Sequence, residues 1–290
     1  MNAARTALVT GANQGLGRAL AAGLASGMSP ADRVLLAGRR PEAVDAAAAE
    51  LTAAAPGGAR IEPCVLDVRD AESIDALAAR LGAVDIVFSN AAARMSPDVD
   101  PADQVDAVAE TNNLATTRIL RAFAPRLRPG GRLMVVASAL GTLDKLDDRA
   151  RPRFAAAAAT TLDAVDDLVT DWRAAVHAGH AVAQGYGTWL NIPSKVAQVA
   201  AVRALALQRR RTDLARGTLI AALCPGLIDT AASRPWFADM SPAQTPAEAA
   251  AWPVQLALGP TAPEALATYY GELVQFGMVI PWGTGIPVPR

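Results

Sequence analysis

The sequence predicts an α/β fold of the Rossmann type, a doubly wound parallel sheet of about seven strands with helices on both faces. Two observations lead to this prediction. Short, nearly continuously apolar runs alternate with longer alanine-rich amphipathic stretches. A glycine-rich turn also follows the first run and opens the first helical stretch, as phosphate-binding turns do in such folds.

Six apolar runs are predicted as strands, and their continuous hydrophobicity predicts that both faces of each strand are buried. The helical stretches between them have the length that right-handed crossovers need, so the strands should run parallel. A seventh strand is expected near Glu272–Gln275. The six runs are Thr6–Thr10, Val34–Ala37, Ile61–Leu66, Val84–Ser89, Leu133–Ala137 and Thr218–Leu223.

Length and composition favour a single domain. The chain has 290 residues, which suits one large α/β domain spanning residues 1–290. Its net charge of −1 gives no electrostatic reason to expect a nucleic acid or an anionic membrane as a partner. No apolar run is long enough to cross a bilayer, and the first residues lead into a strand without a signal peptide. We therefore expect a cytoplasmic protein that acts on a small molecule.

The two cysteines, Cys64 and Cys224, are too few for a disulfide framework, and neither has metal-ligand spacing to a histidine. They are predicted to be buried thiols in a reducing compartment. No metal site is expected.

In doubly wound sheets, ligands bind at the carboxyl ends of the strands. The turn after the first predicted strand carries glycines that permit a tight bend and let backbone N–H groups approach a pyrophosphate. A plain turn between a strand and a helix would not need three glycines. The residues predicted to surround the pyrophosphate are Gly11, Asn13, Gln14, Gly15, Leu16 and Gly17.

The ends of the next three strands predict the rest of a dinucleotide site. Arg39 follows the second strand, where it can bind a 2′-phosphate, which favours NADP(H) over NAD(H); a solvated surface arginine is the alternative. Asp67 and Val68 follow the third strand, where an adenine contact would lie; Asp67 could equally cap the helix predicted at Ala71–Arg80. Asn90 follows the fourth strand, among small residues that let the chain pass close to a cofactor.

These motifs resemble the short-chain dehydrogenase/reductase family, and within it the carbonyl-reductase-like branch, over essentially the whole chain. Residues 10–17 are similar to the family's TGxxxGxG motif, and residues 89–92 to a variant of its NNAG motif. The resemblance implies that Ser138 is the catalytic serine and that Asn112 supports a proton-relay water. It also implies that Lys195 holds the nicotinamide ribose.

The same resemblance assigns the segment after the sixth strand. Pro225, Gly226 and Thr230 match the family's PGxxxT motif, which holds the nicotinamide carboxamide. The segment that follows, residues 231–245, corresponds to a substrate lid. Its Trp236 and Phe237 suggest an apolar and fairly bulky substrate, with simple coverage of the core as the alternative.

Residues 141–185 resemble an insertion typical of the carbonyl-reductase branch. In that branch the insertion packs where other members form a tetramer interface, which implies a monomer. Read independently, Thr160–Asp163 looks like a capping box, and the apolar residues after it follow helical spacing as far as Val176. His177 and His180 end this helix, and we expect them to be terminal cations rather than catalytic residues.

One position departs from the family pattern. The catalytic helix of the family carries Tyr, three residues, then Lys, whereas this chain has Asn191 four residues before Lys195. The two side chains should share one helix face. An amide donates hydrogen bonds but is not an acid near neutral pH, so the usual proton donor is missing. Tyr186 lies too far upstream to replace it, but Tyr186 and Trp189 are predicted to line the pocket together with Trp236 of the lid.

Ser138 and Asn191 are therefore predicted to form an oxyanion hole without a proton donor. Ketone reduction suits such a site poorly, because loss of general-acid help lowers the rate by about 10²–10⁴-fold. We expect an NADPH-dependent reductase of an activated C=C, C=N or C=O bond in a small apolar metabolite. Two other classes stay open: a non-redox cyclase, isomerase or dehydratase with NADP as a structural wall, and an inactive binding protein. The retained Ser138, Asn112 and Lys195 weigh against the inactive protein.

Overall fold

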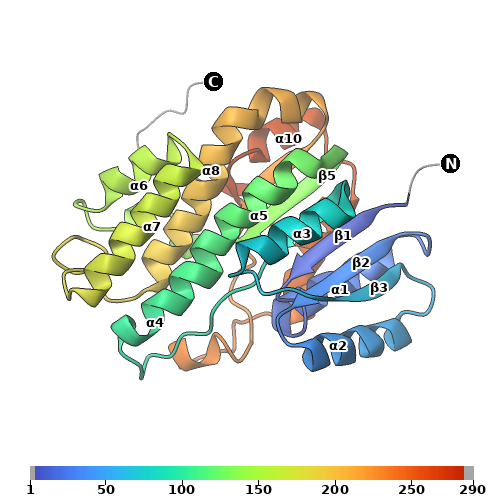
Figure 1. The fold of residues 1–290 in the computed structure, drawn as a ribbon, viewed down its shortest axis with the longest axis horizontal. Helices are drawn as coiled ribbons and strands as arrows, with labels where there is room; N and C mark the ends of the chain where they lie inside the picture. Colours follow the sequence, from blue (N-terminus) through green and yellow to red (C-terminus); the bar gives the residue numbers. More distant parts are fainter. Residues whose placement is uncertain (1–3, 284–290) are drawn as a thin grey trace.

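The computed structural model describes residues 4–283, and its centre is a single eight-stranded sheet (Figure 1). The strand order is β3-β2-β1-β4-β5-β6-β7-β8; the first seven strands are parallel, and β8 is antiparallel to β7. The predicted doubly wound parallel sheet is confirmed. The strands are β1 (Thr6–Thr10), β2 (Arg33–Gly38), β3 (Arg60–Val65), β4 (Val84–Ser89), β5 (Leu127–Val136), β6 (Leu219–Leu223), β7 (Leu273–Gln275) and β8 (Met278–Ile280).

Helices cover both faces of the sheet. In Figure 1, α3, α5 and α8 lie in front of the strands, whereas α1 packs against α9 on the other face. The α-helices are α1 (Gly15–Gly27), α2 (Pro41–Ala54), α3 (Ala71–Leu81), α4 (Pro101–Val108), α5 (Ala115–Phe123), α6 (Arg151–Ala158), α7 (Leu162–His177), α8 (Asn191–Ala215), α9 (Pro246–Leu258) and α10 (Pro263–Tyr269).

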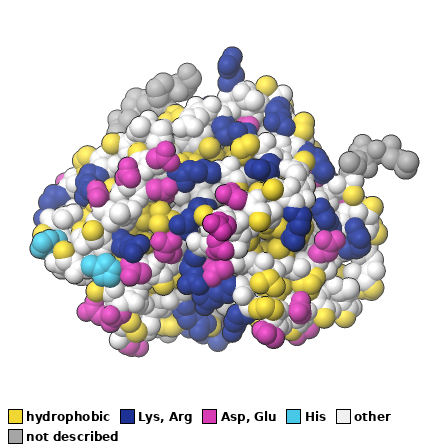
Figure 2. Space-filling view, in the orientation of Figure 1, with side chains coloured by type: hydrophobic (Ala, Val, Ile, Leu, Met, Phe, Trp, Pro, Cys, Tyr) yellow, Lys and Arg dark blue, Asp and Glu magenta, His cyan; other side chains and the backbone are white. Residues whose placement is uncertain are grey.

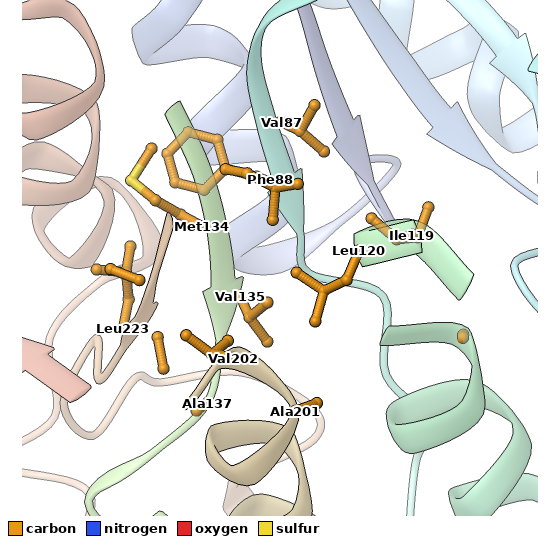
Figure 3. Close-up of a cluster of buried hydrophobic side chains, with 14 of the residues drawn as sticks. Val87, Phe88, Ile119, Leu120, Met134, Val135, Ala137, Ala201, Val202 and Leu223 are labelled. Carbon is orange, nitrogen blue, oxygen red and sulfur yellow. The ribbon is translucent and has the colours of Figure 1, made fainter. Parts of the chain in front are cut away.

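The core between the central strands and the front helices is made of interlocking aliphatic side chains. Figure 3 shows Met134 and Val135, neighbours on β5, pointing to opposite faces of the sheet, with Phe88 of β4 on the same side as Met134. Val135 faces Leu120 of α5 and Val202 of α8. All five side chains are almost completely buried. This packing fixes α5 and α8 on the sheet; Asn112 lies just before α5, and Asn191 and Lys195 lie in the first turns of α8.

The predicted insertion contains α6 and α7, which form a further layer beside α8 (Figure 1). The helix α7 packs on α8 and on α4, and ion pairs join its last turns to α4. Arg173 Nε lies 2.7 Å and His177 Nε2 lies 2.9 Å from Asp106 Oδ1. His177 is the last residue of α7, in line with the predicted helix end, and the structure adds the carboxylate of Asp106 as its partner.

Two strand predictions need correction. The continuous hydrophobicity of residues 61–66 predicted burial on both faces, but β3 is an edge strand paired only with β2, and Val65 is 59% exposed. The strand β8 was not predicted at all. It is created by a hairpin whose two turn residues, Phe276 and Gly277, have φ angles of 48° and 78°, a turn type that sequence marks reliably only when Asn or Asp precedes the glycine.

The helix caps also differ from expectation. The predicted capping box at Thr160–Asp163 is wrong by one residue, because Thr161 is the N-cap and accepts the N–H of Ala164. A complete capping box occurs instead at the start of α9, where Thr245 accepts the N–H of Glu248 and the Glu248 carboxylate returns to Thr245.

Within residues 4–283, no helix is long and apolar enough to cross a membrane. The same residues contain no cluster of His, Cys, Asp or Glu side chains that could hold a metal ion. Cys64 and Cys224 are both buried free thiols.

Candidate active site

The turn between β1 and α1 leaves no room for a side chain at Gly11 or at Gly17. Gly11 has a φ of 63°, and a Cβ atom added there would lie 2.8 Å from Ala91 Cα. A Cβ atom added to Gly17 would lie 2.3 Å from the Gly11 carbonyl oxygen. The absence of Cβ atoms at Gly11 and Gly17 therefore lets the turn pack against itself and against the loop after β4, close to the N–H groups at the start of α1.

Asn90 braces this turn. Its Nδ2 donates to the Thr10 carbonyl oxygen at 2.9 Å, and Thr10 Oγ1 accepts the backbone N–H groups of Asn90 and Ala91 at 2.9 and 3.0 Å. The Nδ2 group of Asn90 is thus bonded to the end of β1. The sequence predicted Asn90 near the cofactor but did not foresee that it joins the loops after β1 and β4.

The ends of β2 and β3 lie next to the same turn. A Cβ atom on Gly38 would lie 3.2 Å from Asn13 Oδ1, which places Asn13 against the end of β2. Arg39 follows and is exposed. Figure 2 shows Lys and Arg side chains gathered low in the centre of the face drawn, between α4 and α2. An anionic ligand would find favourable charge on this face.

Asp67, at the end of β3, does not cap α3. The N-cap is Asp70, whose side chain accepts the Glu72 N–H at 3.0 Å, so the capping alternative for Asp67 is wrong. Asp67 accepts the backbone N–H of Arg69 at 3.0 Å and also binds its guanidinium. These bonds, with a smaller contribution from the charge of Arg39, lower the pKa of Asp67. A carboxylate beside the predicted adenine position therefore stays ionised, while the adjacent Val68 is buried.

Ser138 and Lys195 are brought together by a short 3₁₀ turn at Ala139–Gly141. Ser138 is its N-cap, and Ser138 Oγ accepts the Leu140 N–H at 3.2 Å. A Cβ atom on Gly141 would lie 2.9 Å from the Lys195 carbonyl oxygen, so the turn rests directly on α8. The Ser138 oxygen is used as an acceptor, which leaves its hydroxyl hydrogen free to donate to a ligand.

Asn191 is the first residue of α8, and Lys195 lies one turn further along the same face. The Asn191 side chain is partly exposed and makes no hydrogen bond with the described part of the chain. Pro193 fits inside this first turn because its missing N–H would have no intrahelical partner there. The amide of Asn191 is therefore available to a bound molecule.

Lys195 is held by two acceptors at the base of the site. Its Nζ donates to the Val136 carbonyl oxygen at 3.1 Å and to Gln198 Oε1 at 2.8 Å. Burial lowers the pKa of Lys195 to about 8, with a smaller opposing effect from Cys224. Burial also raises the pKa of the Cys224 thiol, whose Sγ accepts the Ala139 N–H at 3.1 Å. Cys224 is therefore a neutral structural acceptor beside the lysine.

Asn112 lies in a π-helical turn, Ala109–Leu114, between α4 and α5. Its Oδ1 accepts the Ala93 N–H at 2.8 Å, and its Nδ2 donates to Ser194 Oγ at 3.2 Å. Its carbonyl oxygen accepts Gln198 Nε2 at 3.0 Å. Gln198 was missed in the sequence, although one polar residue in an apolar stretch of α8, three positions after Lys195, was a signal that could have found it.

The segment after β6 returns to the glycine turn. A Cβ atom on Gly15 would lie 3.7 Å from Thr230 Cγ2, which places Thr230 opposite the start of α1. The Pro225 carbonyl oxygen accepts Gln244 Nε2 at 3.1 Å, so the far end of the predicted lid is bonded to this loop. Gly226 has a φ of 85°, which only glycine adopts readily.

Of the predicted pocket aromatics, two lie together and one lies apart. The rings of Trp189 and Trp236 are 5.5 Å apart between centroids and tilted by 31°, so the lid meets the approach to α8 there. Tyr186 is 2% exposed and packs edge-on against Phe154 and under Arg153 of α6. It is thus part of the packing of the insertion.

Comparison with known proteins identifies the family. Residues 5–149 match the short chain dehydrogenase family. Carbonyl reductase 3 (NADPH) of Mus musculus is 32% identical over 96% of this chain and 98% of its own length. The Homo sapiens protein of the same name is 31% identical over 96% of this chain and 98% of its own.

Two solved structures share the fold. The menthone neomenthol reductase of Mentha piperita superposes with a TM-score of 0.74 at 22% identity, covering 94% of this chain and 99% of that chain. The salutaridine reductase of Papaver somniferum gives a TM-score of 0.74 at 19% identity, covering 88% of this chain and 96% of that chain.

Proposed function

The chain belongs to the short-chain dehydrogenase/reductase family and is an NADP(H)-dependent oxidoreductase; from this premise we propose that it transfers hydride to an activated bond of a small apolar metabolite without the usual acid. The activated bond is C=C, C=N or an unusually electrophilic C=O. The observation that carries the proposal is the Asn191 amide, unbonded within residues 4–283, in the first turn of α8 on the same face as Lys195.

The residues present fit the dinucleotide. Bound NADP(H) supplies the hydride. The glycine turn, closed to any Cβ atom at Gly11 and Gly17, would hold the pyrophosphate, and Arg39 would face the 2′-phosphate. Lys195 and Thr230 would hold the nicotinamide ribose and carboxamide. These contacts would keep the nicotinamide at the edge where Ser138 begins its 3₁₀ turn.

The chemistry of the oxygen-binding groups decides which substrates react. Ser138 and Asn191 each donate a hydrogen bond, and neither releases a proton near neutral pH. An alkoxide formed from a simple ketone needs that proton in the transition state, so ketone reduction is slow. Addition of hydride to the β-carbon of an enone spreads the charge over an enolate, which two hydrogen bonds stabilise. A protonated imine needs no acid at all. The partly exposed Trp189 and Trp236 give the pocket an apolar wall.

The test is product analysis with NADPH and a panel of enones, imines and saturated ketones. We expect enones or imines to gain two hydrogens, with deuterium from C4-labelled NADPD found at the β-carbon or at the imine carbon. Ser138→Ala should lower turnover strongly with little change in the NADPH Kd, since Ser138 contacts the substrate oxygen. If NADPH binds but no product carries deuterium, and substrate is nevertheless consumed, the non-redox reading replaces this proposal.

Restoring the acid gives a matched variant. Asn191→Tyr should raise the reduction of saturated ketones by about 10²-fold, the lower part of the range for general-acid catalysis. Asn191→Phe, which adds the ring without the hydroxyl, should bring no gain. Equal ketone rates in the tyrosine and phenylalanine variants, with NADPH still bound, would show that position 191 does not face the reacting oxygen.

A further inference from the structure

A buried chain of hydrogen bonds runs from the site lysine into the protein. Gln198 Oε1 accepts Lys195 Nζ at 2.8 Å, and Gln198 Nε2 donates to the Asn112 carbonyl oxygen at 3.0 Å and to Thr116 Oγ1 at 3.2 Å. Gln198 is 2% exposed. Its two amide hydrogens and its oxygen are all paired, which is what a buried amide in an apolar helix face requires.

The far end of this chain is also saturated. The Asn112 carbonyl oxygen accepts Thr116 Oγ1 at 2.6 Å in addition to Gln198, so both of its lone pairs are used. The side chain of Asn112 is bonded to Ala93 and Ser194. The resemblance implied that Asn112 supports a relay water. In this structure the Asn112 carbonyl oxygen accepts its hydrogen bond from the Gln198 amide instead of from such a water.

Lys195 has three hydrogens to donate while it is charged. Two of them go to the Val136 carbonyl oxygen and to Gln198. One remains, and it is the hydrogen available to a bound cofactor. Gln198 and the Val136 carbonyl oxygen together therefore determine which way the ammonium group points.

We propose that Gln198 is a positioning residue that fixes Lys195 as a single hydrogen-bond donor to the bound cofactor and closes the inner path by which a proton could reach the site. An amide neither takes up nor releases a proton near neutral pH, so the bridge is rigid but does not conduct protons. The proposal rests on the proposed function in one respect, namely that Lys195 holds the cofactor ribose.

The bridge has a consequence for the missing tyrosine. Asn191 removes the acid at one end of the site, and Gln198 occupies the position through which an acid there would be resupplied. Restoring tyrosine alone should therefore recover only part of the ketone reductase activity. A smaller residue at position 198 would leave space in which water could join Lys195 to Asn112.

The first test is the pH dependence of NADPH binding, which needs no turnover. Affinity should fall as pH rises through the pKa of Lys195, because the neutral amine loses the donor that faces the ribose. Gln198→Glu places a carboxylate beside the ammonium group and should move the midpoint upward. Gln198→Met, similar in length but without an acceptor, should move it downward. The other titratable group beside Lys195 is the Cys224 thiol, unchanged in all variants.

Gln208→Met is the matched control, since Gln208 lies on the same helix but is exposed. It should leave the midpoint unchanged. Thermal denaturation of each variant identifies any that does not fold, and Gln198→Ala then takes the place of such a variant. The same midpoint in the wild type and in the folded Gln198 variants would overturn the proposal, because a residue that only fills space does not alter the titration of Lys195.

The second test is a double-mutant cycle on ketone reduction with Asn191→Tyr and Gln198→Ala. We expect the double variant to exceed the product of the two single effects by about tenfold. No excess, with equal NADPH affinity, would contradict the closed inner path. If no variant transfers hydride to any substrate, the proposed function fails while the binding titration still decides the role of Gln198.

Discussion

At the scale of single residues, the site is defined by a few side chains whose bonding leaves one group free. Ser138 Oγ accepts from the backbone and can donate outward, and Asn191 has no partner within the described chain. Lys195 has one hydrogen left after its bonds to Val136 and Gln198. The sequence identifies each of these residues. It does not show which hydrogen-bonding group of each residue stays unpaired, because that depends on the neighbours that the fold places around it.

Arg39 carries the cofactor preference. It is exposed at the end of β2, where the 2′-phosphate of NADP(H) would lie. Arg39→Ala should raise the NADPH Kd by about tenfold, consistent with a screened, charge-assisted contact of about 1.4 kcal/mol, and should leave the NADH Kd unchanged. Fluorescence titration with both cofactors measures this.

The control for Arg39 is Arg60→Ala, which lies on the neighbouring strand β3 but at its amino end, away from the carboxyl end of β2 that precedes Arg39. It should change neither dissociation constant. If Arg39→Ala raised the dissociation constants of NADPH and NADH by the same factor, Arg39 would support the fold of the loop and would not bind the 2′-phosphate.

At the scale of elements, α8 connects the site, which lies at the carboxyl ends of the strands, with the opposite end of the sheet, where β6 begins. Its first turn presents Asn191 and Lys195, and its last turn contains Asp213, which is completely buried. Asp213 accepts Tyr270 Oη at 2.6 Å and two guanidinium nitrogens of Arg209 at 2.9 and 3.0 Å. Burial, together with the hydrogen bond to Asp213, raises the pKa of Tyr270 far above its ordinary value, so the hydroxyl stays a donor. This joint fixes the carboxyl end of α8 to the residue that follows α10.

The joint predicts a loss of stability without a loss of chemistry. Tyr270→Phe should lower the free energy of unfolding by about 1–3 kcal/mol, because it leaves a buried carboxylate with one bond fewer. Urea denaturation measures the change, and kcat of the folded protein should be unaltered.

The neighbouring Tyr269 provides the comparison for this prediction. Its hydroxyl donates to the Gly277 carbonyl oxygen at 2.8 Å in a partly buried position, so Tyr269→Phe should lower the free energy of unfolding by only about 0.5–1.5 kcal/mol. A loss in Tyr270→Phe no larger than the loss in Tyr269→Phe would show that the buried carboxylate is solvated by other groups.

At the scale of the whole molecule, the position of α7 affects which surfaces are available for contact with a second subunit. The helix α7 lies over α4 and α8, and Arg173 connects it to Asp106 at 2.7 Å and to Glu110 at 3.4 Å. The insertion therefore covers one face of α4 and α8, and the resemblance places the tetramer interface of other family members where this insertion packs. We propose on this ground that the protein is a monomer.

Sedimentation equilibrium tests the assembly. A single species of about the chain mass, 29.9 kDa, is expected across micromolar concentrations, because the covered face leaves no large apolar surface there. A dimer or tetramer that persists on dilution would contradict the proposal and would require an interface elsewhere, for example at the β8 edge of the sheet.

The parallel sheet follows from the sequence alone, and so does the prediction of where a cofactor binds. Continuous apolar runs specify buried parallel strands, and a glycine turn after the first of them specifies where a phosphate would lie, because both depend on local backbone and burial requirements. The sequence also placed Asn191 four residues before Lys195, and helical periodicity put them on one face. It misjudged β3, whose outer edge depends on the absence of a neighbour, and the β8 hairpin, whose turn has little local signal.

The hydrogen bonds among the site residues depend on the folded structure and could not be predicted from the chain. The bridge from Lys195 through Gln198 to Asn112 joins residues 86 positions apart, and the position of Tyr186 against Phe154 depends on how α6 packs. Hydrogen bonds between distant elements follow from the packing of whole helices against a sheet, and no local pattern in the chain encodes that geometry. The residues of the site are thus a property of the sequence, whereas the one hydrogen that Lys195 has left to donate is a property of the fold.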